Sequence, residues 1–289
     1  MSTPHAVILL CAHGNSPYLT AQVRSIVQQM AAEDILVIVD DGSREVPWDA
    51  LVPHLPSRYA CWSRLQNIGS SQGFMELLFQ DAEDGASHFF LADQDDIWLP
   101  GKIALQKQLT PVAGISVHAT LADWGLQATG QREQTVTAVI ARQSPVHYFL
   151  ETPAPGMTFC IGAGMRDQLR LAQTILREAA CELPHDRIIA GCTGWNDALL
   201  AISEPLVLYR QHTGNQIGAA PPGNLRHTMR RLARWPAILR ESRAASALAT
   251  HWMRIHPRHD TTLQPLYRQR LRQSPLENAI MQTLVWLSK

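Results

Sequence analysis

The sequence predicts an α/β protein built on a mixed, mostly parallel β-sheet. Over the first hundred residues, short apolar runs alternate with segments whose apolar residues recur every three or four positions, as in α-helices. The apolar runs are continuous and rich in β-branched residues, which is typical of parallel strands covered on both faces. Each run ends in polar residues or glycine. Ligands of such sheets bind beyond the carboxyl ends of the strands, so these polar ends are candidate site loops.

The first half of the chain supplies most of the predicted sheet. Polar clusters at 13–15, 40–43, 67–73 and 93–96 each follow a predicted strand. We expect these four loops to converge on one cleft. The predicted elements are strands at 6–11, at 35–39, from Cys61 and at 88–93, helices at 18–30 and from about Phe74, and a proline-rich loop with a short helix at 44–60.

The second half has a less regular pattern. Residues 218–224 are rich in glycine and proline and form the one clear linker. We therefore expect an α/β domain at 1–218 and a small helical C-terminal extension at 219–289. The predicted elements are a helix at 99–109, strands at 114–124 and 135–142, a strand-like segment at 152–165, a helix at 166–180, a short helix after Asp186, and strands at 198–202 and 206–209.

Charge is unevenly distributed along a chain whose net charge is zero. From Pro222 onward the chain has 12 lysine and arginine residues and 3 acidic residues. The part before Pro222 has 13 lysine and arginine residues and 22 acidic residues. The neutral total gives no sign of a nucleic-acid partner. Within the basic tail, 224–243 predicts an amphipathic helix with a kink at Pro236. We expect this helix either to pack on the acidic body or to make a peripheral contact with an anionic membrane.

The sequence carries no pattern typical of export or membrane insertion. The N-terminus lacks a basic segment followed by a long apolar stretch, and no run approaches the ~18–20 apolar residues that span a bilayer. The five cysteines are odd in number and none forms a C-x-x-C pair, which favours reduced thiols. We therefore expect a cytoplasmic protein, peripheral at the inner membrane if the basic helix binds lipid.

The segment FFLADQDDIWLPGK, at 89–102, runs a buried strand directly into three carboxylates. Unpaired negative charge at the end of a buried strand is costly, so a positive group has to offset it. Asp93 and Asp95 project to the same side of an extended chain and can share one divalent cation. Such oxygen ligands favour Mg²⁺ or Mn²⁺, which also bind substrate phosphates. The alternatives are a solvated acidic loop and a helix cap.

Several motifs resemble those of family 2 glycosyltransferases, in the same order along the chain. They are VDDGS at 39–43, NIGSSQGF at 67–74, DQDDIWLPGKI at 93–103 and YRQHTGNQIG at 209–218. The resemblance covers residues 5–218 and is greatest to bacterial rhamnosyltransferase-like members, which build surface polysaccharides. It implies a GT-A fold, a nucleotide diphospho-sugar donor, a Mg²⁺ or Mn²⁺ ion, and inversion at the anomeric carbon. It also implies a saccharide or lipid-linked saccharide as the acceptor.

The resemblance assigns nucleotide binding to the first two motifs. Asp41 resembles the residue that reads the base, with Asp40 in support. Asn67 and Gly69 resemble the loop that runs beside the nucleotide. The family has further small or asparagine residues where this chain has SSQG at 70–73, so contacts from that stretch are not carried over.

The resemblance assigns the diphosphate and its metal to the other two motifs. Asp95 resembles the residue in direct metal contact, and Asp93 is its partner toward the sugar nucleotide. His212 would complete the cation site or touch the diphosphate, although a lone histidine is more often a packed or surface residue. Arg210 suits paired contacts with phosphate oxygens. Negative charge grows on the departing diphosphate, and a cation would stabilise that charge.

An inverting transfer needs a base that accepts the proton of the acceptor hydroxyl. His185–Asp186, in ELPHDRII, resembles the base site of the family, and we expect Asp186 to be the base. The alternative is that Asp186 caps a helix. A phosphohydrolase of the HD type would need further metal ligands in a mainly helical fold, and the strand-rich surroundings argue against it.

Other residues near these motifs have weaker assignments. Gly156, Met157 and Thr158 resemble the segment that lines the acceptor side. Trp98 either stacks on a sugar or anchors the core. Lys102 is expected to be a solvated helix residue.

Two other functions are open at this point. A sugar-1-phosphate nucleotidyltransferase would share the α/β nucleotide-binding style, but CAHGNSPYLT lacks the glycine-rich opening of that class. A non-catalytic nucleotide-sugar-binding module is the other alternative. The donor is also open, with dTDP-rhamnose as the family-level expectation and UDP-sugars next.

Overall fold

The computed structural model describes residues 5–80, 85–126, 132–140, 147–178, 182–212 and 235–256, with Ala279, Gln282 and Thr283. The chain divides into two compact units. The first comprises Met1–Ile140, Ala154–Arg166 and Ala198–Gly218, and the second comprises Ala141–Pro153, Asp167–Asp197 and Ala219–Lys289. Two segments of the expected first domain, Ala141–Pro153 and Asp167–Asp197, thus belong to the same unit as Ala219–Lys289. The expected domains, 1–218 and 219–289, stay a prediction, and the linker at 218–224 lies outside the described residues.

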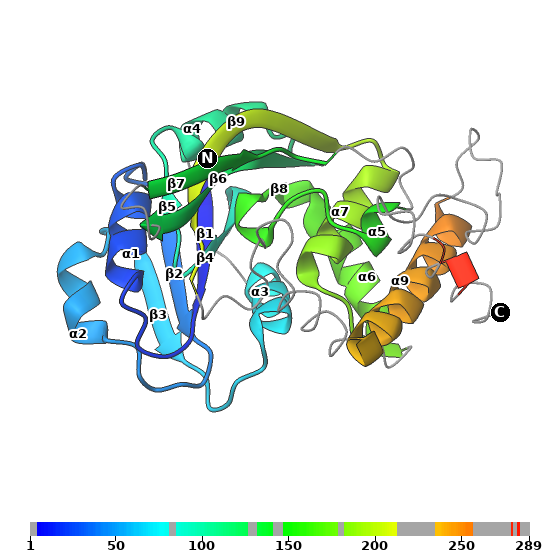
Figure 1. The fold of residues 1–289 in the computed structure, drawn as a ribbon, viewed down its shortest axis with the longest axis horizontal. Coiled ribbons are helices and arrows are strands. Elements are labelled where there is room, and N and C mark those ends of the chain that lie inside the picture. The colour runs from blue at the N-terminus through cyan, green and yellow to red at the C-terminus, as the bar shows by residue number, and fades with distance from the viewer. Residues whose placement is uncertain are drawn as a thin grey trace. The chain divides into compact units, whose positions relative to one another are not determined.

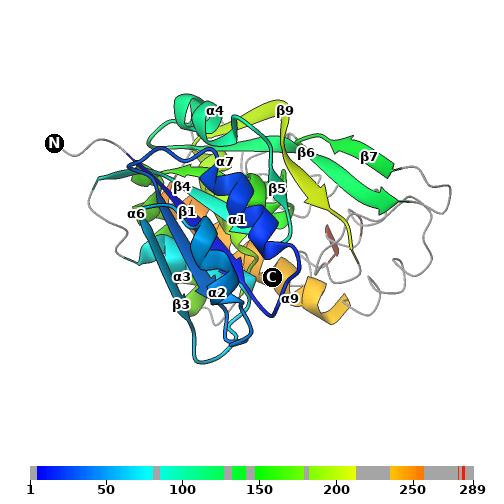
Figure 2. The same cartoon turned by 90° about the vertical axis from the view of Figure 1, so that its left-hand side faces the viewer.

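A mixed, mostly parallel sheet forms the centre of the first unit, as predicted (Figures 1 and 2). Its nine strands, within the described ranges, follow the order β3-β2-β1-β4-β8-β6-β9-β5, with β7 paired to β6. β5, β7 and β8 run antiparallel to their neighbours, and the other pairs are parallel. The strands are β1 (His5–Ala12), β2 (Ile35–Asp40), β3 (Tyr59–Ser63), β4 (Ala86–Asp93), β5 (Ile97–Trp98), β6 (Ile115–Leu126), β7 (Arg132–Thr137), β8 (Cys160–Gly162) and β9 (Leu199–Arg210).

β1 is buried along almost its whole length because helices cover both of its faces. Ile8 and Leu10 lie in one apolar cluster with Val23 of α1 (Leu19–Val27). On the other face, a Cβ added at Gly73 of α3 (Ser70–Phe79) would lie 3.3 Å from Sγ of Cys11. Side chains alternate between the faces of a strand, so α1 and α3 cover opposite faces, as Figure 1 shows.

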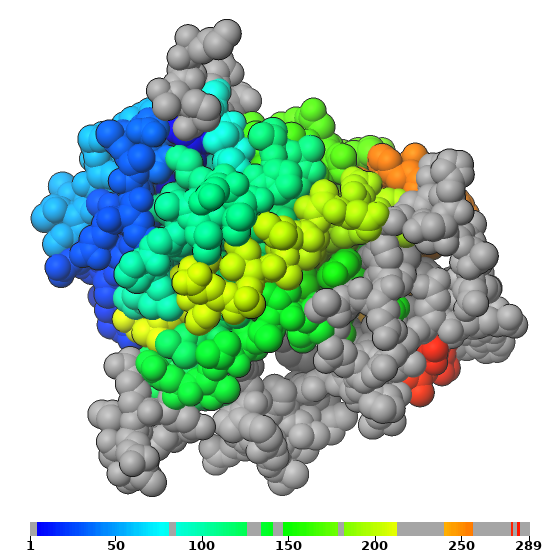
Figure 3. All heavy atoms as spheres, turned by 90° about the horizontal axis from the view of Figure 1, so that it is seen from above, coloured from blue at the N-terminus to red at the C-terminus, as the bar shows by residue number. Residues whose placement is uncertain are grey.

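The end of the sheet differs from the sequence prediction. The strands expected at 198–202 and 206–209 are one strand, β9, which continues through Pro205. Its parallel pairing with β6 shifts register between His118 and Thr120, and this irregularity accommodates the proline. α4 (Lys102–Leu109) lies beside β9 on the surface of this unit (Figure 3).

Most other predicted elements hold with changed bounds, but the strand-like segment expected at 152–165 contains only a three-residue strand, Cys160–Gly162, between two 3₁₀ turns. α3 begins at Ser70, earlier than expected, and β7 begins and ends earlier than the predicted 135–142. Residues 224–234 of the predicted amphipathic helix lie outside the described residues. From Trp235 onward the chain is helical, and Pro236 lies in the first turn, where a missing N–H is tolerated. The expected kink at Pro236 stays a prediction. The remaining elements of the first unit are α2 (Trp48–Leu51), η1 (Val52–His54), η2 (Gly156–Thr158) and η3 (Ala163–Met165).

Helices make up the described part of the second unit. Glycines allow α5 (His147–Leu150) to approach α7 (His185–Trp195) closely. A Cβ added at Gly191 would lie 2.2 Å from the ring of Phe149, and one added at Gly194 would lie 2.2 Å from the ring of Tyr148. Within the described residues, no helix combines the length and hydropathy needed to cross a membrane. The helices are α5 (His147–Leu150), α6 (Arg166–Glu178, whose first residue belongs to the first unit), α7 (His185–Trp195) and α9 (Trp235–Ile255).

Candidate active site

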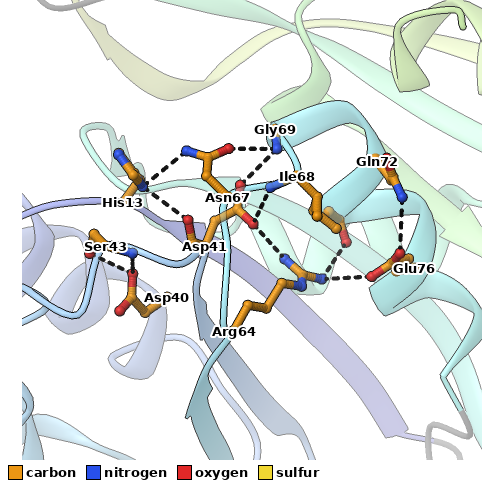
Figure 4. Close-up of polar contacts among 11 residues, drawn as sticks. His13, Asp40, Asp41, Ser43, Arg64, Asn67, Ile68, Gly69, Gln72 and Glu76 are labelled. Carbon is orange, nitrogen blue, oxygen red and sulfur yellow. Dashed lines mark hydrogen bonds and ion pairs between the residues drawn. The ribbon is translucent and has the colours of Figure 1, made fainter.

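The loops that follow β1, β2, β3 and β4 contact one another, because the carboxyl ends of these parallel strands lie at one edge of the sheet. Nδ1 of His13 lies 3.0 Å from the carbonyl oxygen of Asp41 and 3.2 Å from Nδ2 of Asn67 (Figure 4). The side-chain amide of Gln94 accepts from the His13 backbone N–H (2.9 Å) and donates to its carbonyl (3.1 Å). The expected convergence of four polar loops is therefore confirmed.

Asp40 closes the turn after β2. Its carboxylate accepts hydrogen bonds from the N–H (2.9 Å) and hydroxyl (2.6 Å) of Ser43 and from the N–H of Arg44 (2.7 Å). Burial by itself would raise the pKa of Asp40, but these hydrogen bonds outweigh it and hold the pKa below its usual value. Gly42 has a φ of +76°, and a Cβ there would lie 2.3 Å from the carbonyl carbon of Gln66. The turn is thus fixed by one carboxylate and one glycine, and the supporting role of Asp40 in base recognition stays a prediction.

Asp41 ties the loop after β3 to the loop after β2 (Figure 4). Its Oδ1 accepts from Nη1 of Arg64 (3.2 Å) and from the N–H of Ile68 (3.2 Å), and its Oδ2 accepts from the N–H of Gly69 (2.9 Å). The N–H of Gly69 also donates to Oδ1 of Asn67 (2.8 Å). A carboxylate has about four acceptor positions, so Asp41 retains capacity for a ligand N–H. Its role as base reader stays a prediction.

A second cluster joins the D-x-D loop to the end of β9. Oδ2 of Asp95 lies 2.8 Å from Nε2 of His212, although 117 residues separate them. Nη1 of Arg210 donates to the carbonyl oxygens of Asp95 (3.2 Å) and Asp96 (3.4 Å). The ring of Tyr18 lies 5.0 Å from the His212 ring and 5.0 Å from the Arg210 guanidinium. The DQDD and YRQH motifs are therefore in direct contact.

The pairing of β5 with β9 produces this contact. The antiparallel register pairs Ile97 with Leu208 and Trp98 with Val207. Continued outward, this register brings the residues just before β5 opposite the residues just after Leu208. The D-x-D loop thus meets the end of β9.

Asp95 and His212 fit two positions on one divalent ion. An octahedral ion with bonds of about 2.1 Å places adjacent ligand atoms about 3.0 Å apart, close to the separation of 2.8 Å between the carboxylate and imidazole atoms. The described ranges contain no group of three His, Cys, Asp or Glu side chains arranged to hold a metal. Mg²⁺ and similar ions are commonly held by one or two protein ligands, with water and substrate phosphates completing the shell.

The other two carboxylates of the loop lie in different surroundings. Asp93 ends β4, and its carbonyl oxygen accepts from Nε2 of Gln22 (3.0 Å). Asp96 is fully buried, and neither carboxyl oxygen has a hydrogen-bond partner among the described residues. Burial, followed by the charges of Asp93 and Asp95, raises the pKa of Asp96 well above its usual value. The expectation that a positive group offsets the negative charge of this loop stays a prediction.

Asp186 lies in the second unit, in the first turn of α7. The helix begins at His185 after Pro184, so Asp186 is not its N-cap residue. Its Oδ1 accepts from the N–H of Arg187 (2.8 Å), and the Arg187 guanidinium pairs with Glu241 at 3.2 Å. Burial lowers the pKa of His185, and the charge of Asp186 raises it in part. The role of Asp186 as base stays a prediction.

The weaker assignments have mixed outcomes. The side chains of Met157 and Thr158, in η2, are buried, and contact of Gly156–Thr158 with an acceptor stays a prediction. Trp98 is 2% exposed and its ring lies 5.8 Å from Phe90, which favours the core-anchor interpretation. The expectation for Lys102 is wrong, because this lysine is completely buried.

Four residues of these clusters were not singled out in the sequence: His13, Tyr18, Arg64 and Gln94. His13 and Gln94 lie inside expected site loops, so their position was the available signal. Tyr18 precedes a helix and Arg64 follows a strand that is mostly exposed, and neither belongs to a motif. Only the topology of the sheet brings these two side chains to the site.

The fold is the GT-A fold of glycosyltransferases, which confirms the fold expected from the resemblance. Residues 1–349 of TarS from S. aureus, in complex with UDP-GlcNAc, superpose with a TM-score of 0.50 at 14% identity, over 87% of this chain and 73% of that one. The mannosyltransferase PcManGT from Pyrobaculum calidifontis, in complex with GDP-Man and Mn²⁺, gives a TM-score of 0.49 at 13% identity, over 99% and 74%. The sequence matches no protein-family model and no curated protein.

Proposed function

We propose that the protein is an inverting, metal-dependent glycosyltransferase that uses a nucleotide diphospho-sugar. The observation that carries the proposal is the pairing of Asp95 with His212 at 2.8 Å, on the edge of the sheet where Asp41 organises the loop of Asn67. Gln94 links these two clusters through its bonds to His13. A candidate metal pair and a candidate nucleotide loop thus belong to one site.

The donor half of the site lies in the first unit. In this proposal Asp41 accepts a hydrogen bond from the base, Asn67 and Gly69 bind the nucleoside, and Asp93 and Arg210 contact the sugar diphosphate. The similar structure of TarS was determined with UDP-GlcNAc, which supports a uridine or thymidine nucleotide here. The specific expectation is dTDP-rhamnose, with UDP-sugars as the next candidates.

Asp95 and His212 would hold the Mg²⁺ or Mn²⁺ ion. When bound, the ion offsets the negative charge that grows on the departing diphosphate. A neutral imidazole supplies a ligand atom without adding charge, so the charge on the protein side comes from the carboxylates. Tyr18 packs against His212 and Arg210 and keeps both side chains beside the loop.

Asp186 would act as the base. It accepts the proton of the acceptor hydroxyl as the hydroxyl oxygen forms a bond to the anomeric carbon on the face opposite the diphosphate. The bond from that carbon to the diphosphate breaks, its electron pair leaves with the diphosphate, and the configuration inverts. Gly156, Met157 and Thr158 would line the acceptor side.

The acceptor would be a saccharide or lipid-linked saccharide of a bacterial surface polysaccharide, met at the cytoplasmic side of the inner membrane. Peripheral contact was proposed for 224–243, and α9 extends that basic character. Arg240, Arg243, His251 and Arg254 are exposed and recur on one face of α9. Flotation with anionic vesicles, compared with neutral vesicles, tests this contact; equal partitioning would contradict it.

A thermal-shift screen with dTDP-, UDP- and GDP-sugars in Mn²⁺ or Mg²⁺ identifies the donor, and turnover then tests the reaction. Asp95→Ala and Asp186→Ala should abolish transfer while retaining the fold, whereas Asp49→Ala, at an exposed position on α2, should not. Release of a nucleoside diphosphate is expected. Release of pyrophosphate would indicate a nucleotidyltransferase, and binding without any turnover would indicate a non-catalytic module.

A further inference from the structure

The candidate metal loop is attached to the sheet by a very short strand. β5 consists of Ile97 and Trp98, which pair with Leu208 and Val207 of β9. So short a bridge contributes few main-chain hydrogen bonds, and each adds little net stability. Side chains around Trp98 therefore have to fix the loop that carries Asp95.

Trp98 is held by several elements. Its N–H donates to Oγ of Ser25 in α1 (3.0 Å), and its carbonyl accepts from Nε2 of Gln29 (3.4 Å). Its indole ring lies 5.8 Å from the ring of Phe90 in β4. Nζ of Lys102, at the start of α4, lies 4.7 Å from the centre of the indole and 5.6 Å from that of Phe90. A cation over an indole face is favourable, and more so away from water.

The amine of Lys102 makes two hydrogen bonds, one within α4 and one to β6. Its Nζ donates to Oε1 of Gln106 in α4 (2.7 Å) and to Nε2 of His118 in β6 (2.8 Å). Nδ1 of His118 lies 2.7 Å from the carbonyl oxygen of Ala119. Because a carbonyl only accepts, Nδ1 carries the proton and Nε2 is the acceptor for Lys102. Burial, followed by the charge of Lys102, lowers the pKa of His118 well below its usual value, so the imidazole stays neutral.

The polar contact between α4 and β6 continues along the helix. Nε2 of Gln106 donates to Oγ of Ser116 (3.0 Å) and to the carbonyl of Thr158 (3.0 Å), and Oγ1 of Thr110 lies 2.6 Å from Oγ of Ser116. Lys102 and Gln106 are spaced by four residues and so lie on one face of α4, and Thr110 follows as the C-cap residue of the helix. Satisfied polar networks in a core specify a unique arrangement. The network therefore fixes the start of α4 relative to the sheet.

Stability alone does not account for a lysine at this position. Burying an amine costs more free energy than burying an apolar side chain of similar length, and the hydrogen bonds of Lys102 within the described residues are to neutral groups. A methionine at this position would lack two contacts of the lysine, namely the hydrogen bond from Nζ to His118 and the amine 4.7 Å from the centre of the Trp98 indole.

We propose that Lys102 is a positioning residue: bonded to His118, it holds the indole of Trp98 and thereby keeps Asp95 within reach of His212. This inference rests on the proposed function, because its consequence is the affinity of the site for a metal ion. Lys102 itself touches neither the metal pair nor the nucleotide loop in the contacts described above.

Calorimetric titration of UDP and of dTDP into the full-length protein, at increasing Mn²⁺ concentrations, tests the two statements separately. Nucleotide uptake by the wild-type protein that requires Mn²⁺ supports the proposed function; its absence overturns that function and this inference with it. For Lys102→Met we expect the half-saturating Mn²⁺ concentration to rise about 10-fold, as for other residues that orient metal ligands. The melting temperature should not fall by more than a few degrees, because the variant also loses the cost of burying an amine.

Lys107→Met is the matched control, because Lys107 lies on the same helix and its amine binds the buried Asp34 at 3.0 Å. This control should lower the melting temperature and leave the Mn²⁺ dependence unchanged. His118→Leu should reproduce Lys102→Met, and His118→Gln, which keeps an acceptor, should restore part of the affinity. If Lys102→Met does not fold, the difference in Mn²⁺ dependence between His118→Leu and His118→Gln tests the inference.

Unchanged Mn²⁺ dependence in Lys102→Met and His118→Leu overturns the inference. A parallel fall of Mn²⁺ affinity and melting temperature in all variants, the Lys107→Met control included, also overturns it. That result would show a general loss of structure in place of a specific effect on the metal pair.

Discussion

Replacing the buried lysine should change how the stability of the protein depends on pH. Lys102 is completely enclosed, and burial lowers its pKa from 10.5 to about 7. In the unfolded chain the amine keeps its proton up to about pH 10.5. Between these two pKa values the unfolded state binds more protons than the folded state. Raising the pH across this window therefore stabilises the fold.

The magnitude follows from the two pKa values. The two pKa values differ by roughly 3.5, and each pKa unit corresponds to about 1.4 kcal/mol. Below pH 7, where the amine is protonated in both states, its burial therefore lowers the free energy of unfolding by about 5 kcal/mol. The penalty disappears above about pH 10.5, where both states are neutral. Between pH 6 and pH 9 it falls by about 2.5 kcal/mol. The free energy of unfolding of the wild type should rise by that amount relative to Lys102→Met, which has no titrating group at this position.

Chemical denaturation at pH 6, 7.5 and 9 measures this difference. Lys107→Met, measured at the same three pH values, is again the control, because it removes a partly exposed lysine from the same helix. A constant difference between the wild type and Lys102→Met at the three pH values would refute the reasoning. It would show that the amine keeps its protonation state when the chain folds.

Four further substitutions test the loops of the site. Gly42→Ala should lower the free energy of unfolding by about 3 kcal/mol, because the added Cβ would meet the Gln66 backbone and the φ of Gly42 is positive. Gly69→Ala should lower it by only about 1 kcal/mol, because Gly69 has a positive φ but open space around its Cα. Equal melting temperatures of the two variants would contradict this reasoning. Asp40→Asn should cost about 2 kcal/mol at neutral pH in denaturation experiments. The pKa of Asp40 is lower in the folded state, so the stabilisation by its carboxylate is present above the unfolded pKa and is lost as the pH falls through the folded pKa. The difference in free energy of unfolding between the wild type and Asp40→Asn should therefore shrink in acid. A difference that is unchanged at pH 3 would contradict the role of this carboxylate in the turn. His212→Gln should weaken Mn²⁺ binding at least ~10-fold in calorimetry with little loss of stability, and unaltered binding would remove this residue from the metal pair.

The parallel core was predictable because each of its strands carries its own local signal. β1, β2 and β4 are continuous apolar runs that end in polar residues, and those ends are where the site loops begin. The continuity of β9 was not predictable, because Pro205 indicates an end to a strand when only the sequence is considered. Pairing with β6, shifted in register near His118, carries the strand past the proline. The continuity of β9 therefore depends on its pairing with β6, which the sequence around Pro205 does not reveal.

The candidate site was predictable where residues belong to motifs. Asp95 and His212 were expected at a metal, and the structure brings them into contact. Arg64 and Tyr18 were missed because neither the spacing nor the neighbouring sequence distinguishes them from surface residues. Lys102 was misjudged for the same reason, since a lysine at the start of a helix is normally solvated. Its burial depends on the polar face of α4 meeting β6, which is a property of the tertiary structure.

Under the proposed function, the three neighbouring carboxylates of the DQDD loop would lie close to one divalent ion. If all three were ionised, their charge would exceed that of the ion and repel the diphosphate. Burial, followed by the charges of Asp93 and Asp95, raises the pKa of Asp96 well above its usual value, whereas Asp95 is partly exposed and lies 2.8 Å from His212. Under the proposed function, the carboxylates of Asp93 and Asp95 would together match the charge of a single Mg²⁺ or Mn²⁺ ion. A raised pKa at Asp96 would limit the negative charge that this loop adds beside the diphosphate.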